Sequence, residues 1–375
     1  MKKANKMKRE VNIELLRITA MLMVLMLHAL GHGGILDSYE FGTLGYIVFW
    51  FLETICYVAV NIFILITGYF MTSLKMKFSR IIRLIIQVEF FSLFCLAVTY
   101  FVFNTGFTGK DLIFALFPLS SGEYWFASHY LVLITIIPLL NHLINSMDNR
   151  QLFAGTLLLV FVFSVIATIF PWSRNNVVTN GYSFVWFIVL YFVGSCLQKI
   201  KGYYLNSLQY FIIFIFLAVI SLLSRLLIGC ISIKLFGYVD GTDLLYSYNT
   251  LPVLIMSICL LMTFKNMQIR INEKMANFVI SMGKLSFGAY LCSDHNLIRK
   301  PLWKLCDMSK TTTILGTFIY ALILVILIFL IGCILEWFRL KITQLFGLNV
   351  FIQKCDLWFD KFVVRVENVL KGIVL

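Results

Sequence analysis

The sequence predicts an all-α, polytopic membrane protein of about ten transmembrane helices. Hydrophobic residues make up 61% of the chain, charged residues only 13%, and the mean hydropathy is +0.91. No soluble globular domain has this composition. The apolar residues also fall into segments of roughly 20, the length that crosses the hydrocarbon core of a bilayer.

The ten predicted spans follow one another through most of the chain. They are 13–31, 45–71, 80–103, 125–144, 152–171, 182–198, 208–228, 246–264, 276–293 and 313–336. The ninth is the least regular, because Gly283, Lys284 and Gly288 interrupt it. The first carries Arg17 and His28, so we expect a spanning helix there and not a cleaved signal peptide.

Basic side chains occur mainly on one side of this arrangement. Cations cluster before the first span and in alternate loops, at 2–9, Lys77, Arg80, Lys199, Lys265, Arg270 and Lys274. The positive-inside rule therefore places both termini in the cytoplasm. The last outer loop is an exception, since it holds Arg299, Lys300 and Lys304.

The residues after 336 differ from the spans. Apolar residues recur there at helical spacing (Trp358, Phe362, Val366, Val369, Ile373), with cations among them. This pattern predicts an amphipathic helix lying on the inner membrane face. We therefore divide the chain into a membrane-embedded domain, 1–336, and a cytoplasmic tail, 337–375.

The net charge of +13 is explained by these loop cations, so we expect no nucleic-acid partner. The nine cysteines are scattered singly without a Cys-x-x-Cys pair. They predict buried thiols and neither a metal site nor a disulfide framework.

Arg17 and His28 are the most informative residues, because both lie within the first apolar segment. Ionisable groups in such a segment are costly and usually mark function. Their spacing of eleven residues is three helical turns plus roughly 20°, so both face one side, about 16 Å apart. A neutral imidazole can take a proton from a hydroxyl, which makes His28 a candidate general base. Glu14 lies three residues before Arg17 and could pair with it.

His32, four residues after His28, raises the alternative of a metal site. Two histidines at this spacing on a helix can share a metal ion. Gly31, Gly33 and Gly34 are expected to break the helix there, and the sequence offers no third ligand. We therefore predict no metal and interpret His32 as a helix-end residue.

Arg80 and Arg83 open the third span on the predicted cytoplasmic side, three residues apart and so on one face. They could anchor the helix at the membrane surface, as the positive-inside rule describes. They could equally form a phosphate clamp, because the guanidinium fork matches phosphate oxygens.

Further polar and aromatic residues lie near the predicted outer side. Glu53, in the second span, could orient His28, or it could pair with another polar group and so stabilise the bundle. Tyr124 and Trp125 open the fourth span, where they could anchor the interface or stack on a sugar. Asp294 and His295 follow the ninth span and could line an acceptor site or cap the helix.

These residues together resemble the acyltransferase 3 family of integral-membrane acyltransferases. Arg17 and His28 match its Arg-x10-His motif, and Arg80 and Arg83 match its Arg-x-x-Arg motif. The stretches 60–70, 124–141 and 286–299 resemble further family blocks in the same order, so the similarity covers roughly residues 10–335. Thr67 stands where serine is usual, and Ser293 where many relatives have histidine.

The resemblance implies a protein of the bacterial cytoplasmic membrane that transfers an acyl group, usually acetyl, from acyl-CoA to a carbohydrate hydroxyl. In this interpretation His28, Arg17 and Glu53 serve catalysis, Arg80 and Arg83 bind the donor, and Tyr124, Trp125, Asp294 and His295 bind the acceptor. Acetyl-CoA is a co-substrate, and no bound cofactor is expected. The alternatives are a transporter or flippase for a glycolipid or small organic acid, whose path the intramembrane charges would line, and a non-catalytic scaffold. The sequence leaves the sugar and the oligomeric state open.

Overall fold

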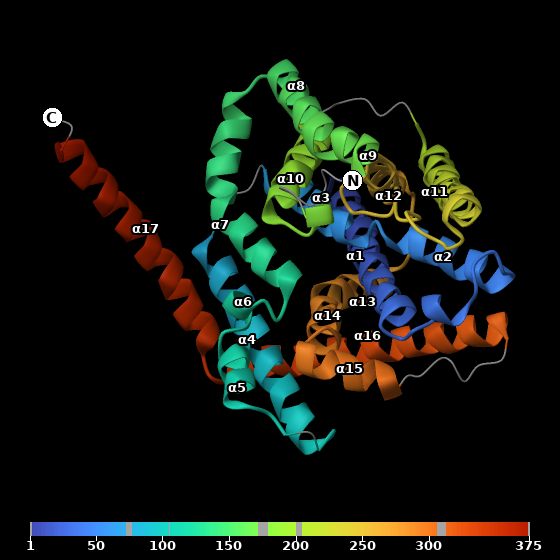
Figure 1. The fold of residues 1–375 in the computed structure, drawn as a ribbon. Helices are drawn as coiled ribbons and strands as arrows, with labels where there is room; N and C mark the ends of the chain where they lie inside the picture. Colours follow the sequence, from blue (N-terminus) through green and yellow to red (C-terminus); the bar gives the residue numbers. More distant parts are fainter. Residues whose placement is uncertain are drawn as a thin grey trace.

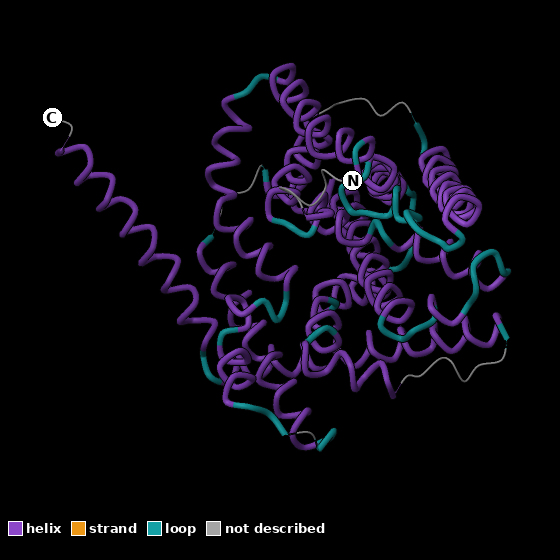
Figure 2. The backbone as a smooth tube through the Cα atoms, in the orientation of Figure 1, coloured by secondary structure: helices purple, strands orange, loops and turns teal. Residues whose placement is uncertain are grey.

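The computed structural model describes residues 2–72, 77–104, 106–171, 179–199, 205–305 and 313–373, and only the backbone of 2–10, 305, 360, 362–364 and 366–373. Within these ranges the chain forms helices joined by turns and contains no strand (Figure 2). The predicted all-α class is therefore confirmed.

Seven helical stretches in the described residues are long and apolar enough to cross a membrane. They are Val11–Ser38, Leu44–Met71, Phe78–Phe101, Trp125–Ser146, Asn149–Ile169, Ser207–Phe236 and Ile314–Leu345. Each coincides with one of the ten predicted spans, so the chain is a multi-pass membrane protein.

The other three predicted spans differ from a regular transmembrane helix. Segments 182–198 and 246–264 form the shorter apolar helices α10 (Phe184–Lys199) and α12 (Leu251–Asn266). Segment 276–293 is two helices, α13 (Glu273–Leu285) and α14 (Phe287–Ser293), which meet at Ser286. The count of ten and the cytoplasmic placement of the termini therefore stay predictions.

Helix α1 (Lys2–Gly31) runs through the middle of the bundle (Figure 1). It contacts α12, α13 and α14, together with α2 (Leu44–Cys56), α3 (Ala59–Met71) and α16 (Ile314–Leu345). It ends at Gly31, and Gly34 adopts a left-handed φ of 73° that favours glycine. The predicted helix break is therefore confirmed, and His32 lies directly after the last helical residue, with its ring 5.5 Å from that of His28.

Helices α3 and α10 touch through two glycines. A Cβ atom at Gly68 would lie 2.4 Å from the carbonyl oxygen of Tyr191, and one at Gly194 would lie 2.4 Å from that of Leu65. Both distances are shorter than any side chain allows, so the backbones approach closely only because both residues are glycine. This contact holds α3 in place, and α3 carries one wall of each cavity described below.

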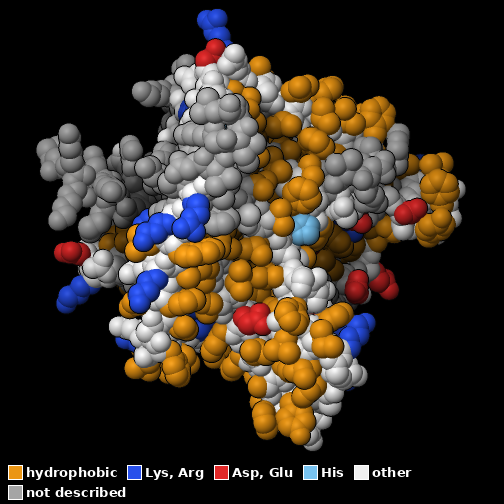
Figure 3. Space-filling model, turned by 90° about the vertical axis from the view of Figure 1, so that its left-hand side faces the viewer, with side chains coloured by type: hydrophobic (Ala, Val, Ile, Leu, Met, Phe, Trp, Pro, Cys, Tyr) orange, Lys and Arg blue, Asp and Glu red, His pale blue; other side chains and the backbone are white. Residues whose placement is uncertain are grey.

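The remaining elements flank this centre. They are α4 (Phe78–Phe101), α5 (Gly109–Leu116), α6 (Pro118–Ser121), α7 (Trp125–Ser146), α8 (Asn149–Val160), η2 (Phe161–Val165), α9 (Ile166–Ile169), α11 (Ser207–Phe236), α15 (Asn296–Leu305) and α17 (Leu348–Ile373), with short turns η1 (Leu36–Ser38) and η4 (Thr179–Gly181). Large apolar side chains cover much of the face in Figure 3, with Lys and Arg gathered in separate groups, as lipid contact requires.

The predicted tail helix is present as α17, which projects away from the bundle (Figure 1). It is attached to the start of α4, where Phe359 stacks on Phe78 at 4.6 Å and the Ser79 N–H donates to Asp356 Oδ1 at 2.6 Å. Trp358 is exposed. The side chains of Phe362, Val366, Val369 and Ile373 lie outside the described residues, and the membrane placement of the tail stays a prediction. Helix α16 continues to Leu345, so the predicted division after residue 336 falls inside it.

Candidate active site

Two cavities adjoin at the centre of the bundle. The first, about 330 Å³, contains His28, and eight of its 18 lining residues are tyrosine, tryptophan or phenylalanine, so we call it the aromatic cavity. The second, about 410 Å³, contains Arg17, Arg80, Arg83 and Lys284, and we call it the basic cavity. Catalysis and charge recognition could therefore occupy neighbouring spaces.

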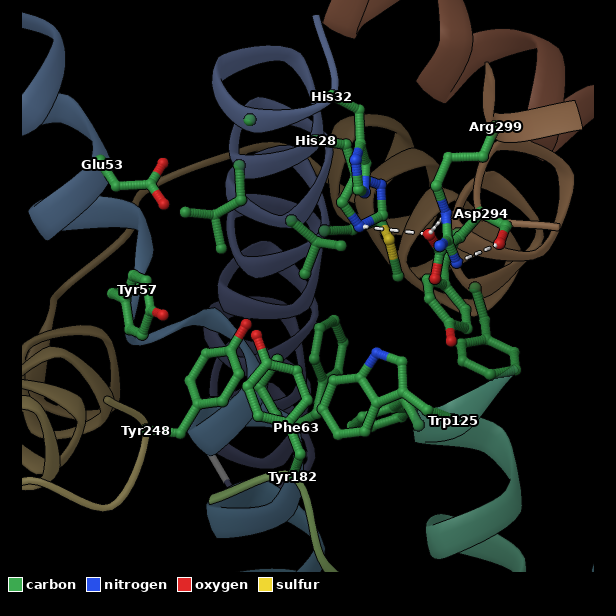
Figure 4. A pocket seen from close by; sticks show the side chains of 18 residues that line it. His28, His32, Glu53, Tyr57, Phe63, Trp125, Tyr182, Tyr248, Asp294 and Arg299 are labelled. Carbon is green, nitrogen blue, oxygen red and sulfur yellow. Dashed lines mark hydrogen bonds and ion pairs between the residues drawn. The ribbon is translucent and has the colours of Figure 1, made fainter. Parts of the chain in front are cut away.

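In the aromatic cavity His28 faces a carboxylate from another helix. Its Nε2 atom lies 3.8 Å from Oδ1 of Asp294, the residue that ends α14 (Figure 4). The Asp294 side chain is almost fully buried, and Arg299 Nε donates to the same Oδ1 at 2.8 Å. Arg299 also donates through Nη2 to the Asp294 carbonyl oxygen at 2.9 Å. The arginine therefore fixes the carboxylate in the position that faces His28.

This arrangement leaves the other imidazole nitrogen for chemistry. Nδ1 of His28 is buried and has no hydrogen-bond partner among the described groups. A carboxylate beside Nε2 favours the tautomer with its proton on that atom. Nδ1 then carries a lone pair that can accept a proton, which is the state a general base needs.

Asp294 also supplies the third metal-ligand candidate that the sequence did not reveal. Ligand atoms of His28, His32 and Asp294 lie within 4.8 Å of one another. Two ligands of a tetrahedral zinc ion lie only about 3.4 Å apart, given bonds near 2.0–2.1 Å. The Arg299 guanidinium, bonded to the same carboxylate, also disfavours a cation here. The observed geometry fits an acid–base pair better than a metal centre.

Glu53 does not orient His28. It lies across the aromatic cavity from the histidine (Figure 4), and no hydrogen bond or ion pair joins them. Asp294 takes the position that sequence analysis gave to Glu53. The reason is tertiary: both helices contact α1, but Asp294, just after α14, faces Nε2 of His28, whereas Glu53 of α2 lies on the other side of the cavity (Figure 4).

Of the four predicted acceptor residues, Trp125 and Asp294 line the aromatic cavity. Trp125 forms a wall with tyrosines from other segments, packing on Tyr182 at 4.6 Å between ring centroids, while Tyr182 packs on Tyr248 at 4.9 Å. Tyr57 extends this wall, 4.8 Å from Tyr248. A surface of several ring faces suits the apolar faces of a sugar.

Tyr124 and His295 line neither cavity, although each is next to a residue that lines the aromatic cavity. Tyr124 is fully buried, and its hydroxyl donates to the Leu291 carbonyl oxygen at 2.8 Å, which ties α7 to α14. His295 is also buried, with Nε2 3.2 Å from Ser92 Oγ and 3.6 Å from Glu123 Oε2. Their positions support packing between helices and not contact with an acceptor in either cavity.

His295 is held neutral. Burial, followed by the nearby positive charge of Arg299, lowers its pKa from 6.5 to about 4. The Leu297 N–H donates to Nδ1 at 3.2 Å, so the single proton of the neutral ring is on Nε2. This ring therefore acts as a fixed donor to its buried neighbours on α4 and before α7.

The basic cavity brings together both arginine motifs. Arg80 and Arg83 lie in the first turns of α4, as predicted, and Arg17 reaches the same space from α1. Lys284, from the end of α13, adds a fourth cation. The expected ion pair between Arg17 and Glu14 is present. Arg83 Nη1 donates to Asn349 Oδ1 of α17 at 3.1 Å, so the tail helix helps to position one of the four cations.

Several residues of the site were missed or given no role in the sequence. Lys284 was noted only as an interruption of an apolar segment, and Tyr182 and Tyr248 are isolated aromatics that look like interfacial anchors. Phe63 and Phe287 lie in the stretches 60–70 and 286–299, which resemble family blocks. That likeness was the one available signal for them.

The fold and these two cavities define a multi-pass membrane protein with a buried His–Asp pair beside a pocket of four cations. The family model described as "Acyltransferase domain" matches residues 10–337. The chain therefore belongs to the acyltransferase 3 family, as its motifs predicted. Comparisons with curated proteins and with solved structures found no match.

Proposed function

We propose that the protein is a membrane-bound O-acetyltransferase that moves an acetyl group from acetyl-CoA to a hydroxyl of a cell-surface polysaccharide or its lipid-linked precursor. The observation that carries this proposal is the adjacency of the basic cavity to the cavity of His28. Family membership supplies the reaction class, and the two cavities suggest where each substrate binds.

The donor binds in the basic cavity. Coenzyme A carries several phosphate charges, and Arg80, Arg83 and Lys284 offer cations to them, with Arg17 further along the cavity wall. Arginine forks bind phosphate oxygens in pairs, which favours a charged nucleotide over a neutral ligand. The pantetheine arm then extends towards His28, and Arg17 stabilises negative charge near the reacting group.

The acceptor binds in the aromatic cavity, and a movement of the site that uncovers the buried Nδ1 of His28 brings a hydroxyl to it. His28 takes the hydroxyl proton while the oxygen attacks the thioester carbonyl carbon. The new C–O bond forms, the C–S bond breaks, and the coenzyme A thiolate leaves and takes up the proton from the imidazolium. Asp294 stabilises the imidazolium in between. Formation of an acyl-histidine before transfer is the mechanistic alternative.

The acceptor is recognised by ring faces and by polar groups at the cavity wall. Trp125, Tyr182 and Tyr248 present aromatic surface, and the Glu53 carboxyl group on the opposite side is placed to form hydrogen bonds with hydroxyls. A carbohydrate combines both features, because its rings have apolar faces and hydroxyl edges.

The test is transfer of label from [acetyl-¹⁴C]acetyl-CoA to glycan in membranes that contain the protein. Wild-type membranes are expected to label glycan and release free coenzyme A, and His28→Ala membranes with equal protein are expected to do neither. Mass spectrometry of surface glycans should show loss of an acetyl ester when the chain is absent. A fully active His28→Ala variant would refute the catalytic assignment, and glycolipid movement without coenzyme A release would favour a flippase.

A further inference from the structure

Three phenylalanines stand where the two cavities meet. Phe63 of α3, Phe126 of α7 and Phe287 of α14 each line both the aromatic and the basic cavity. The Phe126 ring lies 6.1 Å from that of Phe63 and 6.3 Å from that of Phe287, between centroids. These are ordinary aromatic contact distances, so the three rings form one partition between the cavities.

We propose that Phe63, Phe126 and Phe287 form an aromatic gate that the acyl thioester crosses and that limits the transferred group to a short acyl chain. This inference rests on the proposed function, because it concerns the path from the donor to His28. It adds a specificity determinant at the boundary of the two cavities.

The cations of the basic cavity determine which end of the donor crosses the gate. Arg17, Arg80, Arg83 and Lys284 hold the phosphates in the basic cavity, and the ring partition offers them no hydrogen-bond donor. Only the uncharged end of the donor, the thioester and its acyl group, can therefore pass the rings towards His28.

The surroundings of Phe126 limit how far the gate opens. Its ring is buried and packs on Phe187 at 5.4 Å, Tyr130 at 5.8 Å and Tyr290 at 6.1 Å. A ring held by close neighbours on three elements can rotate but has little room to move aside. An acetyl group needs a small opening, whereas each added methylene must displace these neighbours.

The closed rings also keep water from the thioester. Without an acceptor, water could attack the acyl carbon, with His28 taking its proton, to give free carboxylic acid and coenzyme A. The ring partition separates donor and His28 until the acyl group enters, which protects the donor from this wasteful hydrolysis.

The experiment compares acetyl-CoA with butyryl-CoA as donors for Phe126→Leu and wild type. The rate of acyl transfer to glycan in membrane vesicles is measured for each donor, and the butyryl-to-acetyl ratio is the readout. A pocket commonly discriminates one methylene by tenfold or more, so we expect the ratio to rise about tenfold in Phe126→Leu. Hydrolysis of acetyl-CoA by the purified variant, with water as acceptor, should rise as well.

Phe214→Leu is the matched control. Phe214 is a buried phenylalanine of α11 that lines neither cavity. It should lower stability without changing the donor ratio. If Phe126→Leu does not accumulate in membranes, Phe287→Leu takes its place, and Phe63→Trp should change the ratio in the opposite direction by narrowing the passage.

The outcomes separate the gate from the proposed function. Absence of acetyl transfer by wild-type membranes would contradict the proposed function itself. Normal acetyl transfer by wild type, with an unchanged donor ratio in Phe126→Leu and Phe287→Leu, would overturn the gate alone. An equal rise of the ratio in Phe214→Leu would also overturn it, because general loosening would then explain the effect.

Discussion

Replacing Asp294 by asparagine tests whether the Asp294 carboxylate makes the His28 imidazole an effective general base. The substitution keeps the shape of the side chain and removes its negative charge, which lies 3.8 Å from Nε2 of His28. During transfer the ring becomes an imidazolium, so the carboxylate stabilises the transition state more than the ground state. At an effective dielectric constant of about 20, opposite unit charges at this distance attract by about 4 kcal/mol.

This energy sets the expected size of the effect. Since about 1.4 kcal/mol corresponds to a factor of ten in rate, complete loss of the attraction lowers kcat by about 10³. Arg299 keeps its positive charge next to the substituted side chain and adds to the loss. We therefore expect kcat to fall by about 10³-fold or more, with little change in KM for acetyl-CoA, because Asp294 does not line the basic cavity.

The assay is initial-rate acetyl transfer in membranes, with protein amounts matched by immunoblot and folding checked by size-exclusion chromatography in detergent. Asp243→Asn is the control, because Asp243 also pairs with an arginine, Arg225 at 2.6 Å, but lies away from the His28 pair. Asp243→Asn should keep near-normal activity. An Asp294→Asn protein that is folded and within threefold of wild-type kcat would show that His28 does not depend on this carboxylate.

Three further predictions concern donor binding, pH and packing. The double variant Arg80→Gln, Arg83→Gln should raise KM for acetyl-CoA by about tenfold or more, because a hydrogen bond to a charged group contributes about 1.5–3 kcal/mol. An unchanged KM at low salt would contradict the phosphate clamp. Between pH 6.5 and about 4 the unfolded state binds more protons at His295 than the folded state does. The free energy of unfolding is therefore greatest above pH 6.5 and falls by up to about 3 kcal/mol as the pH drops through this window. Melting curves of the detergent-solubilised protein should show this fall, and His295→Gln should make it smaller. Gly194→Val should lower the melting temperature strongly, because its Cβ would lie 2.4 Å from the Leu65 carbonyl oxygen, whereas Gly155→Val, at a position with no neighbour within 4 Å, should not.

The sequence by itself determined the class of the protein and most of its charged residues of interest. Long apolar segments leave no option but membrane helices, because unpaired backbone groups are too costly in lipid. Arg17 and His28 were recognisable for the same reason, since a charge in such a segment requires a protein-lined space. The spacing of Arg80 and Arg83 also placed them correctly on one helix face.

Only the tertiary structure decided which of these residues act together. Nothing local distinguishes Asp294 from Glu53 as the partner of His28, because α14 and α2 both contact α1 and only the folded structure shows that Asp294 is the residue facing Nε2. The four-cation pocket is likewise assembled from α1, α4 and α13. Contacts between segments hundreds of residues apart depend on how the helices pack. The order of residues along the chain does not give the distances between those segments in space.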